Sequence, residues 1–227
     1  MTIARTLRVS EIFSSINGEV TSSYQGSLCT FIRLSGCLLK CSFCDTLRAQ
    51  DLESGQEMTF KEILLKIKEL GNSNITITGG EPLLQQRNLN KLITAIYDQN
   101  SHHYISIETN GSIPIPEEWP VCWVADWKGP SSGERDKMSI KNFKYLLGID
   151  FIKFVIVNRE DFDDAMMIVK SIFNKNSYSP KFAFSACMGV KNAATPKQII
   201  EWMQQEPKLK EEGAIFNLQI HKIIDIQ

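Results

Sequence analysis

Short apolar runs alternate with longer amphipathic runs along most of the chain. The short runs are rich in β-branched and aromatic residues, which predicts strands over 29–34, 75–78, 104–108, 121–125, 151–157, 181–185 and 216–220. The longer runs repeat apolar residues at three- and four-residue spacings, which predicts helices over 60–70, 88–99, 159–173 and 196–205. This alternation of strands and helices indicates an α/β chain.

Two of the predicted helices carry capping signals at their first residues. Thr59 is followed three residues later by Glu62, which is typical of a capping box. Thr195 is followed by Pro196, a residue that fits the first turn of a helix. Because no repeat or linker divides the chain, we expect residues 1–227 to form a single domain. The fold we predict is an incomplete TIM-like barrel of parallel strands with helices outside.

Nearly every predicted strand is followed by a polar or glycine-rich group. These groups are Ser35-Gly36-Cys37, Thr78-Gly79-Gly80-Glu81, Glu108-Thr109-Asn110-Gly111, Asp126-Trp127-Lys128 and Ser185. Parallel α/β folds place their sites at the carboxyl ends of the strands. We therefore expect these groups to share one site.

Three cysteines, Cys37, Cys41 and Cys44, form a C-x3-C-x2-C pattern directly after the first predicted strand. Cysteine thiolates are the usual ligands of iron–sulfur clusters, commonly four to a four-iron cube. No further cysteine lies close enough in the sequence to serve as a local fourth ligand. We therefore expect a cluster with one iron open to a small molecule.

Two other uses of the cysteines are weaker but stay open at this point. Structural zinc sites use similar spacings but need four protein ligands, and no second cysteine pair or nearby histidine accompanies the three. Disulfides are disfavoured because we find no secretory signal. Cys29, Cys122 and Cys187 each lie in an apolar run, where a buried free thiol is the usual state.

The composition is that of a globular soluble domain. The chain is 43% apolar and 22% charged, and its formal net charge is −1. A charge so close to neutral gives no electrostatic basis for binding nucleic acid or an anionic membrane. No apolar stretch approaches the ~20 residues of a membrane helix, and residues 1–11 carry neither a signal core nor a lipidation motif. We expect a protein of the reducing cytoplasm.

The group Gly79-Gly80-Glu81-Pro82 is a second unusual feature. The glycines allow the backbone to approach a ligand, and the proline ends the strand. The same residues also fit an ordinary strand-to-helix turn, in which Glu81 is a first-turn carboxylate favoured by the helix dipole. The position of this group after the cysteine triplet favours a ligand site.

The triplet, with Phe43 before its last cysteine and Gly79-Gly80-Glu81-Pro82 behind it, resembles the radical S-adenosylmethionine superfamily. Within that superfamily, residues 11 to about 224 resemble the 7-carboxy-7-deazaguanine synthase family. The matching segments are FSSINGE at 13–19, FIRLSG at 31–36, CDT at 44–46, ETNG at 108–111, KGPSSG at 128–133, KFVI at 153–156 and LQIHK at 218–222. Together these segments are far more specific than the superfamily pattern.

The resemblance implies that the three cysteines hold a four-iron four-sulfur cluster whose fourth iron binds S-adenosylmethionine. One electron, from a donor such as flavodoxin or ferredoxin, then produces methionine and a 5′-deoxyadenosyl radical. Thr46 matches the residue that helps to hold Mg²⁺ beside the substrate. The residues implied to line the S-adenosylmethionine pocket are Phe43, Gly80, Glu81, Asp126, Trp127, Lys128 and Ser185.

The substrate of the family is 6-carboxy-5,6,7,8-tetrahydropterin, which a lyase reaction converts to 7-carboxy-7-deazaguanine with loss of ammonia, on the route to queuosine. The family regenerates S-adenosylmethionine in each turnover and forms homodimers. Arg33 offers a planar fork that suits the substrate carboxylate. The residues implied to bind the substrate are Asn17, Gly18, Glu19, Arg33, Thr78, Glu108, Asn110 and His221.

Several of these residues also have an ordinary structural interpretation. Phe43 fits a packing residue in a tight loop, Arg33 a surface arginine and Glu108 a solvated strand end. By spacing alone Thr46 is a loop threonine. A single histidine is more often structural than catalytic, but His221 falls on the same side as Gln219, opposite Leu218 and Ile220, and so shares a polar face with it.

The chain departs from the family in four places. Asn17 stands where the family usually has glutamine, and Val20 where it usually has glycine. Asp126-Trp127 replaces a small or proline-containing pair. Asp225-Ile226-Gln227 extends the chain past the usual end.

Two rival functions stay open from the sequence. A glycyl-radical activating enzyme shares the cysteine spacing but lacks the Cys44-Asp45-Thr46 and Glu108-Thr109-Asn110-Gly111 groups. A non-enzymatic zinc-binding module would use the cysteines without redox chemistry.

Overall fold

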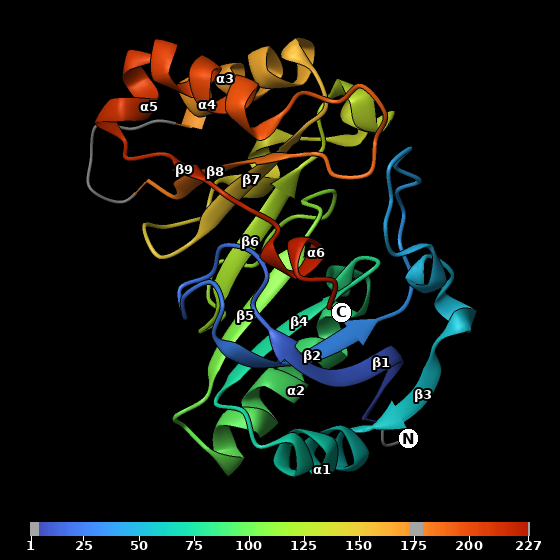
Figure 1. Cartoon of the computed structure of the whole chain (residues 1–227). Helices are drawn as coiled ribbons and strands as arrows, with labels where there is room; N and C mark the ends of the chain where they lie inside the picture. The colour runs from blue at the N-terminus through green and yellow to red at the C-terminus, as the bar shows by residue number, and fades with distance from the viewer. Residues whose placement is uncertain (1–4, 173–178, 227) are drawn as a thin grey trace.

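The computed structural model describes residues 5–172 and 179–226, and nine strands of this part form one curved sheet (Figure 1). Their order across the sheet is β3-β1-β2-β4-β5-β6-β7-β8-β9. The strands are β1 (Thr6–Ile16), β2 (Leu28–Leu34), β3 (Gln56–Thr59), β4 (Asn74–Gly79), β5 (Tyr104–Thr109), β6 (Cys122–Trp127), β7 (Phe151–Ile156), β8 (Lys181–Ala186) and β9 (Ile215–Phe216).

Every neighbouring pair from β2 to β9 is parallel, which confirms the predicted parallel barrel-like sheet. The first strand, β1, runs antiparallel to both β2 and β3. These two antiparallel strands were not predicted from the sequence. Their signal is weak because only Leu7 and Val9 of β1 are fully buried, and β3 buries no residue fully.

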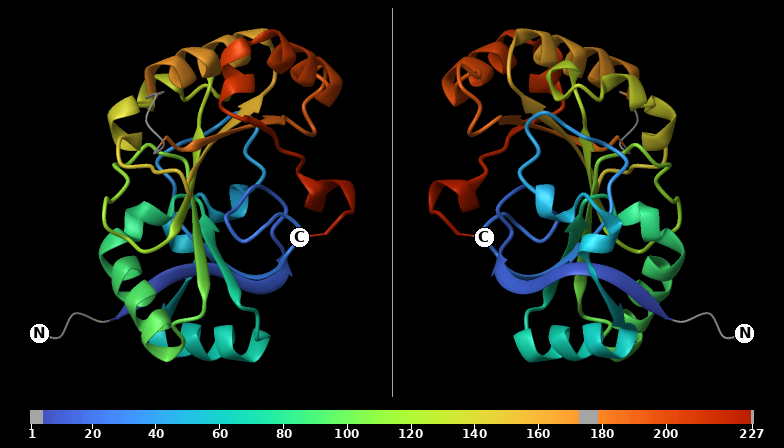
Figure 2. Two further views of the ribbon diagram at one scale, coloured as in Figure 1. Left: turned by 90° about the vertical axis from the view of Figure 1, so that its left-hand side faces the viewer. Right: turned by 90° about the vertical axis from the view of Figure 1, so that its right-hand side faces the viewer.

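Helices cover the outer face of the sheet, as Figure 2 shows from two sides. The predicted capping box at Thr59 and the predicted N-cap at Thr195 are both present, and Thr195 also forms a capping box with Gln198. The helix predicted over 159–173 ends at Ile172 in the structure, and Phe173 lies outside the described residues. The helices are α1 (Phe60–Leu70), α2 (Gln86–Gln99), α3 (Arg159–Ile172), α4 (Pro196–Gln205), α5 (Pro207–Glu211) and α6 (Ile220–Ile223).

The strand predicted over 216–220 is wrong. Only Ile215 and Phe216 pair with β8, and the chain then leaves the sheet at Asn217. The side chain of this asparagine donates to Ser185 Oγ at 2.7 Å and accepts from the Val20 amide at 3.0 Å. These bonds turn the chain inward, and α6 follows on the inner side of the sheet (Figure 1).

Strand alternation separates an apolar outer face from a polar inner face. In β4, Ile75 and Ile77 are fully buried in the main core, so Thr76 and Thr78 point to the other side. The parallel register keeps the two faces aligned from strand to strand. Ile77 pairs with Ile107 on the outer face, and Asp126 pairs with Lys153 on the inner face. Among the described residues no helix has the length and apolar character of a membrane span.

Gly79 ends β4 in a conformation that only glycine adopts without strain, with φ of +148°. A Cβ here would lie 2.1 Å from the Leu34 carbonyl oxygen of β2. Gly71 has φ of +72° but no heavy atom within 4 Å of such a Cβ. The two glycines therefore separate the effect of strain from the effect of a clash.

We expect Gly79→Ala to lower the free energy of unfolding by at least about 3 kcal/mol, because the added methyl group overlaps a fixed backbone. Gly71→Ala, the matched control, should cost about 1 kcal/mol, the strain of the left-handed conformation alone. Urea unfolding of both variants measures the difference. Equal losses would show that no close contact constrains Gly79.

Candidate active site

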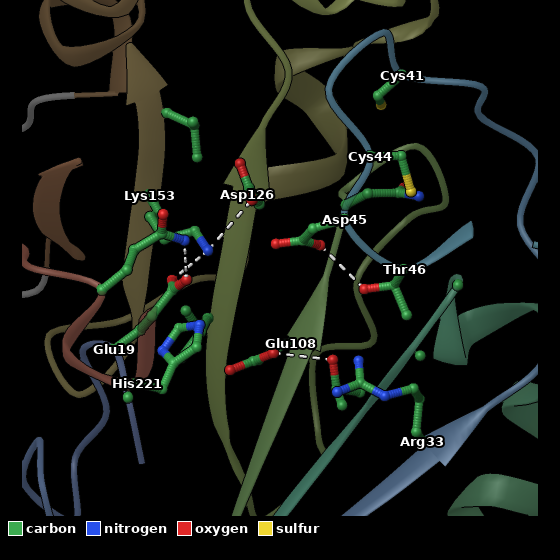
Figure 3. A pocket seen from close by; sticks show the side chains of 18 of the residues that line it. Glu19, Arg33, Cys41, Cys44, Asp45, Thr46, Glu108, Asp126, Lys153 and His221 are labelled. Atoms are coloured by element: carbon green, nitrogen blue, oxygen red, sulfur yellow. Dashed lines mark hydrogen bonds and ion pairs between the residues drawn. The ribbon is translucent and has the colours of Figure 1, made fainter. Parts of the chain in front are cut away.

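A cavity of about 400 Å³ lies at the carboxyl ends of the parallel strands. Its wall is completed by the cysteine loop after β2, by the segment after β1 and by α6. Figure 3 shows side chains from all of these segments turned toward one another. The predicted site residues that line the cavity are Gly18, Glu19, Arg33, Cys37, Cys41, Phe43, Cys44, Thr46, Thr78, Gly80, Glu108, Asn110, Asp126, Lys128 and His221.

The cysteine loop is held against the turn that follows β4. A Cβ on Gly80 would lie 2.3 Å from the Gly36 carbonyl oxygen and 2.7 Å from that of Ala49. The amide of Cys37 donates to the carbonyl of Gln50 at 2.9 Å. The glycine at position 80 is therefore required by the packing of this loop, whether or not a ligand also approaches it.

The three thiols meet the chemical requirements of a cluster site. Cys37, Cys41 and Cys44 are all unpaired and partly exposed to the same cavity. The side-chain amide of Asn110 donates to Cys37 Sγ at 3.4 Å, and hydrogen bonds to cysteine sulfur are a feature of iron–sulfur sites. Burial raises the pKa of the Cys41 thiol to about 11, so a bound metal would have to displace its proton.

The described residues do not contain three histidine, cysteine, aspartate or glutamate side chains arranged around one metal ion. This finding bears on the zinc alternative, because a closed zinc site needs four such ligands around a single point. A cube of four irons places each thiolate on a different iron. Three free thiols that line one cavity can each bind a different iron of such a cube.

Glu81 does not line the cavity. Its carboxylate is fully buried and accepts from Thr109 Oγ1 at 2.8 Å, from the Asn110 amide at 2.7 Å and from the Leu83 amide at 2.9 Å. It caps the short helix Pro82–Gln85 and fastens the turn after β4 to the turn after β5. The structure thus gives Glu81 the role of a structural capping residue that aligns two ligand-bearing turns.

Three other predicted residues are buried behind the cavity wall. Trp127 donates from Nε1 to Asp164 at 2.9 Å, Ser185 accepts from Asn217, and Asn17 donates to Ser27 at 2.9 Å. The structure does not bring these side chains to the cavity surface. Their assignment to ligand binding stays a prediction from the family motifs.

At one end of the cavity, arginines surround an acidic residue of β1. Glu11 Oε1 lies 2.7 Å from Arg33 Nε and 2.6 Å from a terminal nitrogen of Arg48. The Arg33 side chain is 14% exposed and lies over the Phe13 ring at 5.7 Å. It therefore faces the cavity, and Arg48, which sequence reasoning missed, lies beside it. Two guanidinium groups share one carboxylate here.

Buried acidic groups line the opposite end, and lysines neutralise them. Lys153 forms a close ion pair with Glu19 and lies 3.3 Å from Asp126 (Figure 3). Lys128 lies 3.0 Å from Asp126. Burial alone would raise the pKa of Asp126, but the two lysines hold it below its ordinary value. Lys153 was known from sequence only as part of the KFVI match.

Glu108 lies between these two ends. Its Oε2 accepts from Thr78 Oγ1 at 2.8 Å. Burial, and then the nearby Glu19 carboxylate, raise the pKa of Glu108 above its ordinary value. The pKa of Glu19, in contrast, lies below its ordinary value. Two neighbouring acids whose pKa values shift in opposite directions are typical of sites that transfer protons.

The remaining contacts tie the C-terminal segment to the cysteine loop. Lys222 Nζ lies 2.6 Å from Asp45 Oδ2, and Thr46 Oγ1 donates to Asp45 Oδ1 at 3.0 Å. The ring of His221 packs on Gly18, where a Cβ would lie 2.0 Å from its Nδ1. The predicted strand alternation of His221 is wrong, since it lies on α6, but the residue still lines the cavity.

Comparison with known proteins agrees with this site. The model of the Radical SAM superfamily matches residues 31–120, which include the cysteine loop and the turns after β4 and β5. The chain is 37% identical over 222 residues to the 7-carboxy-7-deazaguanine synthase of Clostridium acetobutylicum, covering 96% of this chain and 95% of that protein. It is 33% identical to the synthase of Chlorobaculum tepidum, covering 99% and 96%.

Among solved structures, the crystal structure of QueE from Escherichia coli covers 93% of both chains with a TM-score of 0.70 and 16% sequence identity. That similarity shows the same fold. The near-full-length relatives favour a synthase over the glycyl-radical activating enzyme considered from the sequence. The chain is a radical S-adenosylmethionine enzyme that belongs to the 7-carboxy-7-deazaguanine synthase family.

Proposed function

We propose that this enzyme converts 6-carboxy-5,6,7,8-tetrahydropterin to 7-carboxy-7-deazaguanine with loss of ammonia, a lyase reaction of queuosine biosynthesis. The observation that carries the proposal is the division of one cavity into three parts. Three unpaired thiols, a pair of acids with a lysine, and two arginines on one carboxylate all line it. A substrate with a guanidine-like edge and a carboxylate needs the last two parts.

Cys37, Cys41 and Cys44 would hold the cluster, and S-adenosylmethionine bound to its open iron would supply the 5′-deoxyadenosyl radical that abstracts hydrogen from the carboxylate-bearing ring carbon. Around it, Phe43 offers an aromatic face at the cavity surface. The Asp126–Lys128 ion pair supplies charges of both signs on the strand β6 side, which suits the amino and carboxylate groups of the cofactor.

The protein itself orients the pterin. Glu19 is ionised and accepts hydrogen bonds, so it suits the N–H groups of the ring edge. Arg33 uses Nε for Glu11 and keeps the end of its guanidinium for the substrate carboxylate. Because Arg33 and Arg48 share a single carboxylate, one positive charge is left to balance the substrate's negative charge.

Glu108 is the residue best placed to carry a proton during the loss of ammonia. It contacts Thr78, lines the cavity beside Glu19 and has a raised pKa. A raised pKa makes a carboxyl group more able to take up and then release a proton during turnover than an ordinary glutamate. Asn110, which lines the same wall, offers a further amide to the ring.

The proposed enzyme also uses a magnesium ion and an external electron donor. Thr46 and the adjacent carboxylate of Asp45 supply oxygen ligands of the type that Mg²⁺ prefers. The electron donor is a small redox protein such as flavodoxin or ferredoxin, and an oxygen-sensitive cluster suits the reducing cytoplasm. Residues 1–227 act as one domain, a proposal that the continuous sheet supports.

A homodimer is the proposed assembly. Apolar side chains on the hairpin after β1 and on the C-terminal segment are exposed, among them Tyr24 at 82% and Leu28 at 66%. The two segments lie next to each other, since Gly26 faces the Ile220 side chain. Exposed apolar residues grouped in this way suit a contact between subunits.

The proposal is tested by anaerobic incubation of the reconstituted enzyme with the carboxytetrahydropterin, S-adenosylmethionine, Mg²⁺ and dithionite. We expect the absorbance of 7-carboxy-7-deazaguanine to appear and more than one product to form per S-adenosylmethionine. Cleavage of S-adenosylmethionine without any deazaguanine would exclude this substrate.

We expect Cys41→Ala to abolish cluster assembly and leave the fold intact, because the residue lies on a loop outside the core. Iron content should fall below about one-tenth of the wild-type value, while Tm should change by less than about 4 °C. Cys187→Ala is the matched control, since this thiol also lines the cavity but lies outside the triplet; it should keep its iron. If Cys41→Ala still cleaves S-adenosylmethionine, the ligand assignment is wrong.

Arg33→Lys should raise KM for the pterin about tenfold, because a point charge replaces a planar fork. Cleavage of S-adenosylmethionine in the absence of the pterin should stay within about twofold of wild type. The exposed Arg159→Lys on α3 serves as the control. A pterin KM that does not change in Arg33→Lys would remove this residue from the substrate site.

A further inference from the structure

Lys153 extends from β7 into the cavity between acidic residues of two other segments. Its Nζ forms a close ion pair with Glu19 Oε2 and lies 3.3 Å from Asp126 Oδ2. Its side chain is only 9% exposed. The family resemblance assigns the residue to no ligand, yet its position is the most enclosed of any cation in the cavity, since the Lys128 and Lys222 side chains are 16% and 27% exposed.

Glu19 receives hydrogen bonds on both of its oxygens. Lys153 contacts Oε2, and Gln219 Nε2 donates to Oε1 at 2.6 Å. No third donor reaches this carboxylate within residues 5–172 and 179–226. Because each carboxylate oxygen has two lone pairs, one lone pair on each oxygen is left for a ligand. Two parallel acceptors of this kind fit the adjacent N–H groups of a flat guanidine-like edge.

Asp126 anchors the lysine on the side away from Glu19. It lies beside Lys153 in the register of β6 and β7, and it is held in turn by Lys128 at 3.0 Å. The result is a line of alternating charges, Lys128, Asp126, Lys153 and Glu19, that ends at the substrate side of the cavity. A lysine fixed in this way has little freedom to move from Glu19.

We propose that Lys153 is a positioning residue for the substrate: its ammonium group, fixed by Asp126, orients the Glu19 carboxylate toward the ring edge of the pterin. The inference rests on the proposed function, because that function supplies the ring edge. Lys153 itself is not a proton donor in this scheme, since the negative charges of Asp126, Glu19 and Glu108 raise its pKa well above its ordinary value.

The electrostatic surroundings of Glu19 support this role. It is faced by Lys153 of β7, Asp126 of β6, Glu108 of β5 and His221 of α6. Burial alone would raise the pKa of Glu19, but the charge and hydrogen bond of Lys153, with a further hydrogen bond from Gln219, hold the pKa below its ordinary value. Without the lysine, burial and the neighbouring carboxylates would all act to raise the pKa, and Glu19 would take up a proton as the pH falls.

The test compares Lys153→Met, Lys153→Gln and Lys153→Arg with the exposed control Lys66→Met on α1. At about pH 8 we expect Lys153→Met and Lys153→Gln to raise the pterin KM by at least about tenfold, while iron content stays within about twofold of the wild-type value. Lys153→Arg keeps the charge and should recover most of the affinity. Lys66→Met should match wild type.

The pH dependence separates positioning from a merely structural role. Wild-type KM should change less than about threefold from pH 8 to pH 6, because Glu19 stays ionised. In Lys153→Met and Lys153→Gln, KM should rise by about a further tenfold over that range, because Glu19 becomes protonated. A structural lysine would lower Tm without adding this dependence.

A folded Lys153→Met or Lys153→Gln with wild-type KM and a flat pH profile would overturn the inference. If Lys153→Met fails to fold, Lys153→Gln, which keeps a hydrogen-bond donor, decides the question by the same two readouts. Wild-type turnover, measured in parallel, keeps the two proposals apart. If the wild type forms product and the variants behave like it, only the role of Lys153 fails, whereas absence of wild-type product means that the proposed function fails first.

Discussion

Charges buried at the carboxyl ends of the parallel strands must neutralise one another, and the site depends on this constraint. Strand alternation sends apolar residues outward to the helices and leaves Glu108, Asp126 and Lys153 facing inward. A buried carboxylate without a partner costs several kcal/mol. Lys153 offsets this cost for Glu19, and Lys128 offsets it for Asp126, because each lysine forms an ion pair with the carboxylate. Within residues 5–172 and 179–226, the hydrogen-bond donor that reaches Glu108 is the hydroxyl of Thr78, and no cation forms an ion pair with it, so Glu108 is the acid most able to hold a proton.

The cysteine loop obeys a second constraint, close backbone packing. Gly36 has φ of +98°, and Gly80 allows the loop backbone to rest on the turn after β4. Glu81, buried beneath, joins that turn to the one after β5. The thiols, the acids and the arginines therefore reach one cavity because three neighbouring strand ends are fastened together. The Asp45–Lys222 ion pair adds the C-terminal segment to this arrangement.

The sequence predicted those features that depend on residues close together in the chain. Parallel strands, two capped helices and the cysteine triplet follow from periodicity and spacing, and most motif residues do line the cavity. The sequence could not predict the role of a residue whose contacts come from distant parts of the chain. Glu81 and Glu108 look alike at strand ends, yet the first caps a turn and the second faces the cavity. Lys153 shows no signal alone, because its importance comes from residues far away in the chain, Glu19 and Asp126.

The central claim is that one cavity binds a cluster through three cysteines and keeps its fourth iron for S-adenosylmethionine. Mössbauer spectroscopy of the ⁵⁷Fe-reconstituted enzyme, with and without S-adenosylmethionine, tests it most directly. The account predicts that one iron of the cube changes its isomer shift when S-adenosylmethionine binds and that the others do not. Four equivalent irons that are unaffected by the cofactor would contradict it.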